Sequence, residues 1–232
     1  MPMPKLQNET ELSDIQLWAI SLSAMLTQLN RDRHDRLRFH DHSESYVKQA
    51  RMDIKRDWEI SSAEDLRKEL RALDTSLKAS TSFFYYKESM SALTLGEKES
   101  MLEDPQRSAV KAFEPQRDEF LYNSYSDVID RVGTDAWNDG RAVWLCRVAF
   151  DAGLISEEEA WEEIFTIAKR CSTHYQSWEE FGLSYAVGFQ NWKPSGFHAH
   201  DVSGVMFDLR FLLFGENSPW RHVAWEVGET LA

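Results

Sequence analysis

The segment DAWNDGRAVWLCRVAFDAGLISEEEAWEEI, residues 135–164, indicates the fold class more clearly than any other part of the chain. Its first half repeats apolar side chains at the spacing of a helix, and Gly153 follows as a residue suited to the left-handed position that ends helices. Ser156 and Glu159 then have the spacing of a capping box, in which two side chains bind free N–H groups at a helix start. The segment therefore predicts a helix over Trp137–Ala152, a turn, and a second helix over Glu157–Arg170.

The same signals predict helices along most of the remaining chain. Apolar spacing predicts one helix over Leu12–Arg31, started by Ser13 or Asp14, and a polar loop or frayed helix end over residues 32–45. Two further helices are expected to begin at capping boxes: one after Ser61 and Glu64, and one over Trp178–Gln190 after Ser177 and Glu180. Other helices are expected over residues 46–58, from about Asn123 to Val132, over Val205–Phe214, and after Pro219.

Composition agrees with a helical protein. The chain has 232 residues with only 10 Gly and 6 Pro, so residues that interrupt helices are scarce. Its length suits one domain or two small ones, and no alternation typical of strands is sustained. We predict an all-α fold in which residues 1–232 form a single compact domain of about eight or nine helices. Residues 1–10 are expected to be a flexible N-terminus, and residues 96–118 a mobile internal segment.

The charge and cysteine content narrow the possible partners and location. A formal net charge of −13 opposes binding to nucleic acid and favours a basic protein partner, although solubility alone would also explain it. Only Cys146 and Cys171 are present, both in apolar helical contexts, which suits a reducing cytoplasm. The start of the chain lacks the pattern of a signal peptide, and the apolar stretch over Val205–Phe214 is too short and too charged to cross a membrane.

Candidate chemistry in the sequence is sparse. Asp135, Asp139, Arg141 and Arg147 surround the start of the first helix of the opening segment and could line a cleft, but a structural role for them is the stronger interpretation. Two His pairs, His40 with His42 and His198 with His200, lack further ligands at a recognised spacing, so no metal and no cofactor are predicted. Cys146 with His174 is rejected as a nucleophile and base, because Cys146 lies among core residues.

Acidic residues gather at the start of the second helix of the opening segment. A solvated outer face is the simpler interpretation, and a docking surface for a basic partner is the functional one. A Trp exposed near this patch would serve as an interface anchor. The predicted partner-binding residues are Glu157, Glu158, Glu162, Glu163, Glu179 and Glu180.

Three stretches in order, residues 56–70, 136–164 and 177–192, together resemble a bacterial domain-of-unknown-function family of the YbeU/YbeR type. The residues that match its motifs include a group that we call the family-motif residues: Trp137, Asp139, Arg141, Arg147, Trp178 and Tyr185. A Gly-His pair that often follows the first motif is replaced here by LDTSLKASTSFF, so a function resting on that His is not expected. The resemblance implies a bacterial, mainly helical, cytosolic domain.

Three functions fit these observations. The first is an acidic interaction protein, specifically an immunity protein that binds and occludes a basic bacterial toxin domain. The second is a hydrolase or transferase with a cleft around Asp139 and Arg141, although the chain carries no recognised catalytic motif. The third is a secretion adaptor or chaperone, which would expose an apolar patch for its client. The interaction protein is the preferred prediction, with an enzyme left open as the alternative.

Overall fold

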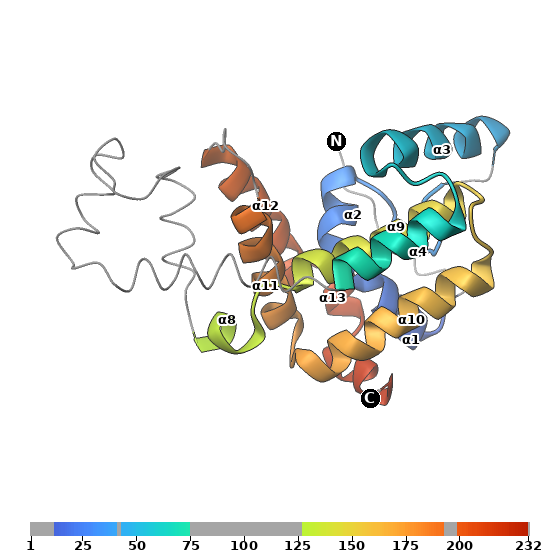
Figure 1. Ribbon diagram of the computed structural model, residues 1–232. Coiled ribbons are helices and arrows are strands. Elements are labelled where there is room, and N and C mark those ends of the chain that lie inside the picture. Colours follow the sequence, from blue (N-terminus) through green and yellow to red (C-terminus); the bar gives the residue numbers. More distant parts are fainter. Residues whose placement is uncertain (1–11, 41–42, 75–126, 193–198, 232) are drawn as a thin grey trace.

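The structure is a computed structural model that describes residues 12–40, 43–74, 127–192 and 199–231. These residues form α-helices and one 3-10 helix without a strand, so the predicted all-α class and approximate helix number are confirmed (Figure 1). The elements are α1 (Asp14–Ser21), α2 (Ala24–Asn30), α3 (Glu44–Trp58), α4 (Ala63–Asp74), α8 (Asp127–Val132), α9 (Ala136–Asp151), α10 (Glu157–His174), α11 (Trp178–Trp192), α12 (Ala199–Phe214), α13 (Pro219–His222) and the 3-10 helix η2 (Trp225–Leu231). The expected flexible residues 1–10 and mobile residues 96–118 lie outside the described residues.

Helix α9 is the central element of the described fold. It packs against α1, α2, α3, α4, α10 and α11, and most of its side chains are buried. Its contact with α11 is close, because a Cβ on Gly188 would lie 2.5 Å from the Thr134 carbonyl oxygen and 2.7 Å from the Trp137 Cβ. Because α9 is covered on several sides, it has no solvent-exposed polar face, and its buried polar side chains, such as Asp139 and Arg147, are bound within the fold.

The turn between α9 and α10 has the predicted local geometry. Gly153 has a φ of +63°, and its N–H donates to the Phe150 carbonyl while the Leu154 N–H donates to the Ala149 carbonyl. These two bonds are the Schellman arrangement that satisfies carbonyl groups at a helix end. Ser156 and Glu159 form the capping box that starts α10. The structure thus confirms the helix–turn–helix unit, with α10 continuing four residues beyond the predicted Arg170.

Two predicted helices are each divided in the structure, and the prediction of one continuous element was wrong in both cases. The N-terminal helix ends at Ser21 and restarts at Ala24, because the Ser23 hydroxyl donates to the Ile20 carbonyl and competes with helical backbone bonds. The segment after Pro219 is likewise divided, into α13 and η2. Ser13, one of the two predicted N-caps, starts α1 and forms a capping box with Gln16.

Two predicted capping boxes differ in detail. At the start of α4, the Ser62 hydroxyl accepts the Asp65 N–H at 3.1 Å, and the Asp65 carboxylate accepts the Ser61 N–H at 3.0 Å. The predicted box of Ser61 and Glu64 was therefore displaced by one residue. At α11, Ser177 accepts the Glu180 N–H as predicted, but the Glu180 carboxylate accepts the N–H of Gln176 instead of that of Ser177.

An aromatic cluster joins the N-terminal helix to the C-terminal elements. Trp18 of α1 lies 5.5 Å from Trp178 of α11 and 5.0 Å from Trp225 of η2, measured between ring centroids. Trp178 also stacks on Trp220 of α13 at 5.2 Å. Gly228 in η2 faces the same ring, since a Cβ there would lie 2.2 Å from Trp18. Segments at opposite ends of the described chain are therefore locked together by aromatic packing.

Candidate functional site

The family-motif residues contact one another only in part. Trp137 of α9 meets Tyr185 of α11 edge to face, with ring centroids 5.1 Å apart. The Arg141 guanidinium lies 4.4 Å from the Trp137 ring centroid and 5.6 Å from that of Trp58, at the end of α3. Burial lowers the pKa of Arg141 to about 10, so the guanidinium stays charged at neutral pH. These residues form a cation–π group between three helices.

Asp139 belongs to a different, buried group. Its carboxylate accepts a hydrogen bond from Arg170 of α10 at 2.5 Å, and Arg170 also binds Asp74 at the end of α4. Burial raises the pKa of Asp139, and the charge of Arg170 opposes that rise. The carboxylate of Asp139 thus ties α9 to α10 and, through Arg170, to α4. This is the structural role that the sequence favoured for it.

Arg147 is fully buried and binds the polypeptide backbone. Its Nε and Nη2 atoms donate to the carbonyl oxygens of Leu37, Arg33 and Arg36, at 3.3, 2.6 and 2.7 Å. Its Nη1 atom donates to the hydroxyl oxygens of Ser23 and Thr27, at 2.9 and 3.0 Å. Burial lowers the pKa of Arg147 to about 9, which leaves it protonated at neutral pH. All five N–H groups of the guanidinium are therefore used inside the protein.

The carbonyl groups that Arg147 binds belong to residues 31–40, which we call the arginine-rich segment. The Asp151 carboxylate, one helical turn after Arg147, accepts the N–H of Phe39 at 3.0 Å from the same segment. His34 is also buried there, and burial lowers its pKa to about 3, so it is neutral at neutral pH. The described residues 32–40 are a loop without helix, as the first of the two expected alternatives predicted, and several of their side chains are buried. Asp151 was missed because a single carboxylate at a helix end carries no motif.

The six family-motif residues therefore do not make one site. Trp178 lies in the aromatic cluster with Trp18 and Trp225, while Asp139 and Arg147 are enclosed by separate sets of partners. The side chains of Asp139 and Arg147 are buried, and each is bound to partners within the fold. Two of the four residues of the alternative cleft, Asp139 and Arg147, are therefore engaged in internal hydrogen bonds.

Asp208 on α12 is a partly buried carboxylate that the sequence did not single out. Burial raises its pKa to about 6. The pKa of an Asp in an unfolded chain is about 3.9, so the folded state holds the proton more tightly. The stability that this contributes is complete below pH 4 and is lost as the pH rises through 6.

Replacing Asp208 with Asn should remove this pH dependence. We expect the difference in the free energy of unfolding, Asn variant minus wild type, to grow in favour of the variant between about pH 4 and pH 6 and then to level off. Urea titrations at pH 4, 5, 6 and 7 measure that difference, and the other titrating groups cancel in it. A difference that stays constant across these pH values would contradict a raised pKa for Asp208.

The predicted acidic patch divides into paired and unpaired side chains. Glu163 lies 3.4 Å from Arg67 of α4, Glu180 forms an ion pair with Arg131, and the Glu157 carboxylate accepts the Trp161 indole N–H at 3.4 Å. Glu158, Glu162 and Glu179 are exposed, and their carboxylates make no hydrogen bond or ion pair with described residues. Glu179 and Glu180 begin α11, beyond the far end of α10, which is about 27 Å long. The two groups of acidic residues therefore do not form one continuous patch.

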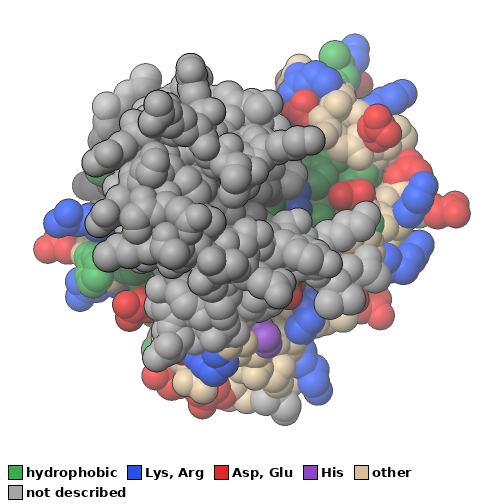
Figure 2. Space-filling model, turned by 60° about the vertical axis from the view of Figure 1, so that its left-hand side comes forward, with side chains coloured by type: hydrophobic (Ala, Val, Ile, Leu, Met, Phe, Trp, Pro, Cys, Tyr) green, Lys and Arg blue, Asp and Glu red, His purple; other side chains and the backbone are tan. Residues whose placement is uncertain are grey.

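Charged side chains elsewhere on the surface are mixed. On the face that Figure 2 displays, Lys and Arg side chains alternate with Asp and Glu over the described residues. A mixed surface of this kind suits solubility and does not by itself mark a partner.

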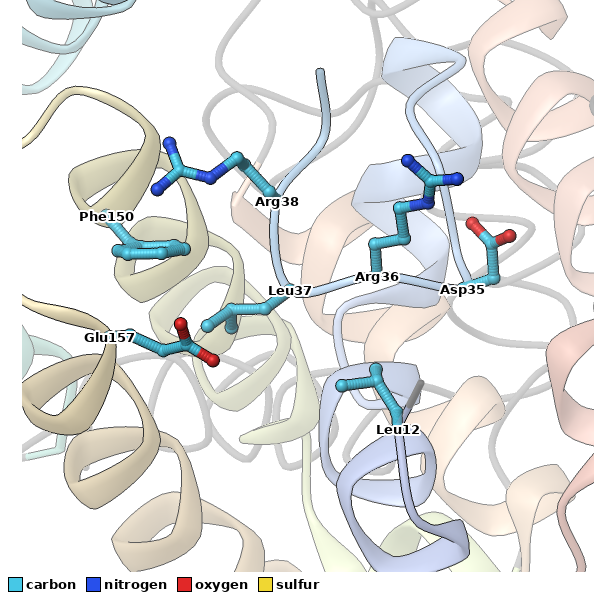
Figure 3. A pocket seen from close by; sticks show the side chains of 7 residues that line it. All are labelled: Leu12, Asp35, Arg36, Leu37, Arg38, Phe150 and Glu157. Atoms are coloured by element: carbon cyan, nitrogen blue, oxygen red, sulfur yellow. The ribbon is translucent and has the colours of Figure 1, made fainter. Parts of the chain in front are cut away.

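The first pocket formed by described residues lies where the arginine-rich segment meets the turn between α9 and α10. It has a volume of about 330 Å³ and is lined by Leu12, Asp35, Arg36, Leu37, Arg38, Phe150 and Glu157. Figure 3 shows Arg38 beside Phe150, with Arg36 directed away from Glu157. The Arg38 guanidinium carbon lies 4.1 Å from the Phe150 ring centroid.

The second pocket, of about 220 Å³, lies on the arginine-rich segment itself. It is lined by Arg31, Asp32, Arg33, Arg36, Phe39 and His40. Arg36 contributes to both pockets.

The metal and thiol candidates are less informative. His42 and His198 lie outside the described residues, and among those that are described no group of three or more His, Cys, Asp or Glu side chains is placed to hold a metal ion. His40, exposed, stacks on Tyr46 with ring centroids 4.4 Å apart. Cys146 and Cys171 are free, buried thiols, and burial raises the pKa of both, which makes them poor nucleophiles.

A comparison with family models assigns most of the chain to a family. Of the described helices, none has both the length and the apolar character needed to cross a membrane. Searches among curated proteins and among solved structures gave no match. A family model described as "Protein of unknown function (DUF1266)" matches residues 53–225, a range that contains the three motif stretches but not α1, α2 or the arginine-rich segment. The chain therefore belongs to the DUF1266 family of proteins of unknown function.

Proposed function

We propose that this chain is an interaction protein that binds a basic protein partner through the outer face of α10. The contact surface consists of Glu158, Trp161, Glu162 and Phe165, which we call the α10 stripe. These residues are spaced three and four apart, so they lie side by side along one face of the helix.

The observation that carries this proposal is the combination of unpaired acidic and partly exposed aromatic side chains on the α10 stripe. Glu158 and Glu162 are exposed without an ion pair among the described residues, whereas their neighbours Glu159 and Glu163 are both bound to Arg67. Trp161 and Phe165 are half-buried and stacked, with ring centroids 5.6 Å apart. Aromatic anchors beside charges that attract the partner are typical of protein interfaces.

Internal bonding argues against the enzyme as the preferred function. A cleft would need Asp139 and Arg147 to be available to a substrate, but each is buried and hydrogen-bonded within the fold. In this proposal the buried motif residues stabilise the domain, and exposed residues bind the partner.

The specific form of the proposal is an immunity protein. We propose a bacterial chain of the YbeU/YbeR type that acts in the cytoplasm and occludes the active surface of a basic toxin domain. The negative side chains of the α10 stripe would speed association with a positive surface, and the aromatic pair would supply most of the contact area.

One observation favours a second candidate, a chaperone or secretion adaptor. Phe207 and Phe214 lie two turns apart on α12 and are 64% and 69% exposed. Exposed aromatic side chains at this spacing would suit an apolar client segment.

Capture experiments with charge-reversal variants test the proposal. We expect the tagged chain to recover one basic protein in stoichiometric amount from its native cells, and the double variant Glu158→Lys, Glu162→Lys to lose it. The control variant Glu44→Lys, Glu216→Lys changes the net charge equally at exposed positions on α3 and after α12, and should retain the partner. Retention by the α10 variant would overturn the surface assignment, and loss only on replacing Phe207 and Phe214 with Ser would favour the adaptor.

A further inference from the structure

The arginine-rich segment reverses the charge of the chain locally. It contains four Arg, two Asp and no Lys, which gives it a net charge of +2 in a protein of net charge −13. The buried side chains of the segment include His34, Asp35, Leu37 and Phe39, while Arg31 and Arg36 are exposed. The guanidinium groups of these exposed residues are therefore presented to solvent over a packed interior.

The backbone of the segment is held in place from beneath. Arg147 binds three of its carbonyl groups and Asp151 binds one of its N–H groups, so the positions from which the Arg side chains project are fixed. Arg31 adopts a φ of 60°, a conformation in which Gly or Asn would be less strained. A binding site gains affinity when its groups are positioned before the ligand arrives.

The charges that face the 220 Å³ pocket are only partly neutralised. Arg33 donates to both oxygens of Asp35, at 3.0 and 2.8 Å. Asp32 is the carboxylate in the pocket lining, and its Oδ2 atom accepts the Trp144 indole N–H at 3.4 Å. The side chains of Arg31 and Arg36 make no hydrogen bond or ion pair with described residues, although the charge of Arg36 is close enough to Asp35 to act on it.

We propose that this pocket binds the phosphate group of a small phosphorylated molecule. A carboxylate would be satisfied by one guanidinium, as Asp35 is by Arg33, whereas a phosphate dianion offers several acceptor oxygens to Arg31 and Arg36 together. The pocket of about 220 Å³ admits a small ligand, with the buried ring of Phe39 in its lining. The site is separate from the α10 stripe and does not depend on the proposed protein partner.

Calorimetric titration of the full chain with inorganic phosphate at constant ionic strength tests the site. We expect saturable binding at one site, weakened at least about tenfold by Arg36→Ala and by Arg31→Ala. Arg210→Ala is the matched control, because Arg210 is also exposed but lies on α12, and it should bind phosphate as the wild type does. Acetate, titrated in the same way, should bind much more weakly.

Three results would overturn the assignment. These are the absence of saturable phosphate binding, an equal loss of binding in the Arg210 control, and acetate binding as strong as phosphate binding. Thermal unfolding of each variant shows whether it is folded, and since Arg31 and Arg36 are exposed, both Ala variants should unfold near the wild-type temperature.

Discussion

Replacing Arg147 with Leu is expected to lower the free energy of unfolding by about 3–5 kcal/mol, the range seen when one partner of a buried charged network is removed. The substitution leaves the carbonyl groups of Arg33, Arg36 and Leu37 without their donor in the interior. Each buried polar group left unbonded costs about 1–3 kcal/mol, and partial opening of the arginine-rich segment limits the total. Urea unfolding followed by tryptophan fluorescence measures the change.

The matched control for Arg147 is Arg56→Ala. Arg56 is an exposed residue of α3 whose ion pairs with described residues are to its near neighbours Asp53 and Asp57, so its loss should change stability by less than about 0.5 kcal/mol. Proteolysis by trypsin provides a second readout, because release of the arginine-rich segment in the Leu variant should expose its four Arg residues to cleavage. A Leu variant as stable and as resistant to trypsin as the wild type would show that Arg147 does not organise the segment.

Truncating Trp18 to Ala should have a similarly large effect, with a loss of about 3–5 kcal/mol. Trp18 is fully buried, and its ring contacts Trp178 and Trp225 from two other elements. The substitution would remove the ring contacts between α1 and η2 and leave a cavity, so the packing of both ends of the described fold would weaken. The free energy of unfolding and amide hydrogen exchange of residues 225–231 measure these two consequences.

Trp161→Ala is the control for the aromatic cluster. Trp161 is half-buried and stacks only on Phe165 among the described rings, so its truncation should lower the free energy of unfolding far less than that of Trp18. Equal losses at Trp18 and Trp161 would mean that the cluster does not hold the termini together. The Trp161 variant is also informative for function, because this residue belongs to the α10 stripe.

Local sequence signals were sufficient to predict the central helices. Gly153 and the capping box of Ser156 and Glu159 are interactions between residues close in sequence, so the turn between α9 and α10 could be predicted. The break between α1 and α2 could not, because the apolar spacing continues through it. Ser23 interrupts the helix with a hydroxyl that also accepts from Arg147, a residue more than a hundred positions away.

The arginine-rich segment shows a second limit of sequence reasoning. Arg147 and Asp151 bind it largely through backbone N–H and carbonyl groups. Because almost every residue carries these groups, the side-chain pattern of the segment does not predict the contact. The acidic residues of α10 could be located from the sequence, but which of them are bound to Arg67 depends on the packing of α4 against α10. The sequence therefore locates the acidic residues, and the structure shows which of their carboxylates are bound to Arg67.

The most direct test of the proposed function is the affinity of the purified chain for its captured partner, measured at low and at physiological salt. The wild type should bind more weakly as salt rises, and the Glu158→Lys, Glu162→Lys variant should bind at least about tenfold more weakly than the wild type at low salt, chiefly through slower association. The Glu44→Lys, Glu216→Lys control should bind as the wild type does. Equal affinities for the wild type and the α10 variant at both salt concentrations would contradict binding through the α10 stripe.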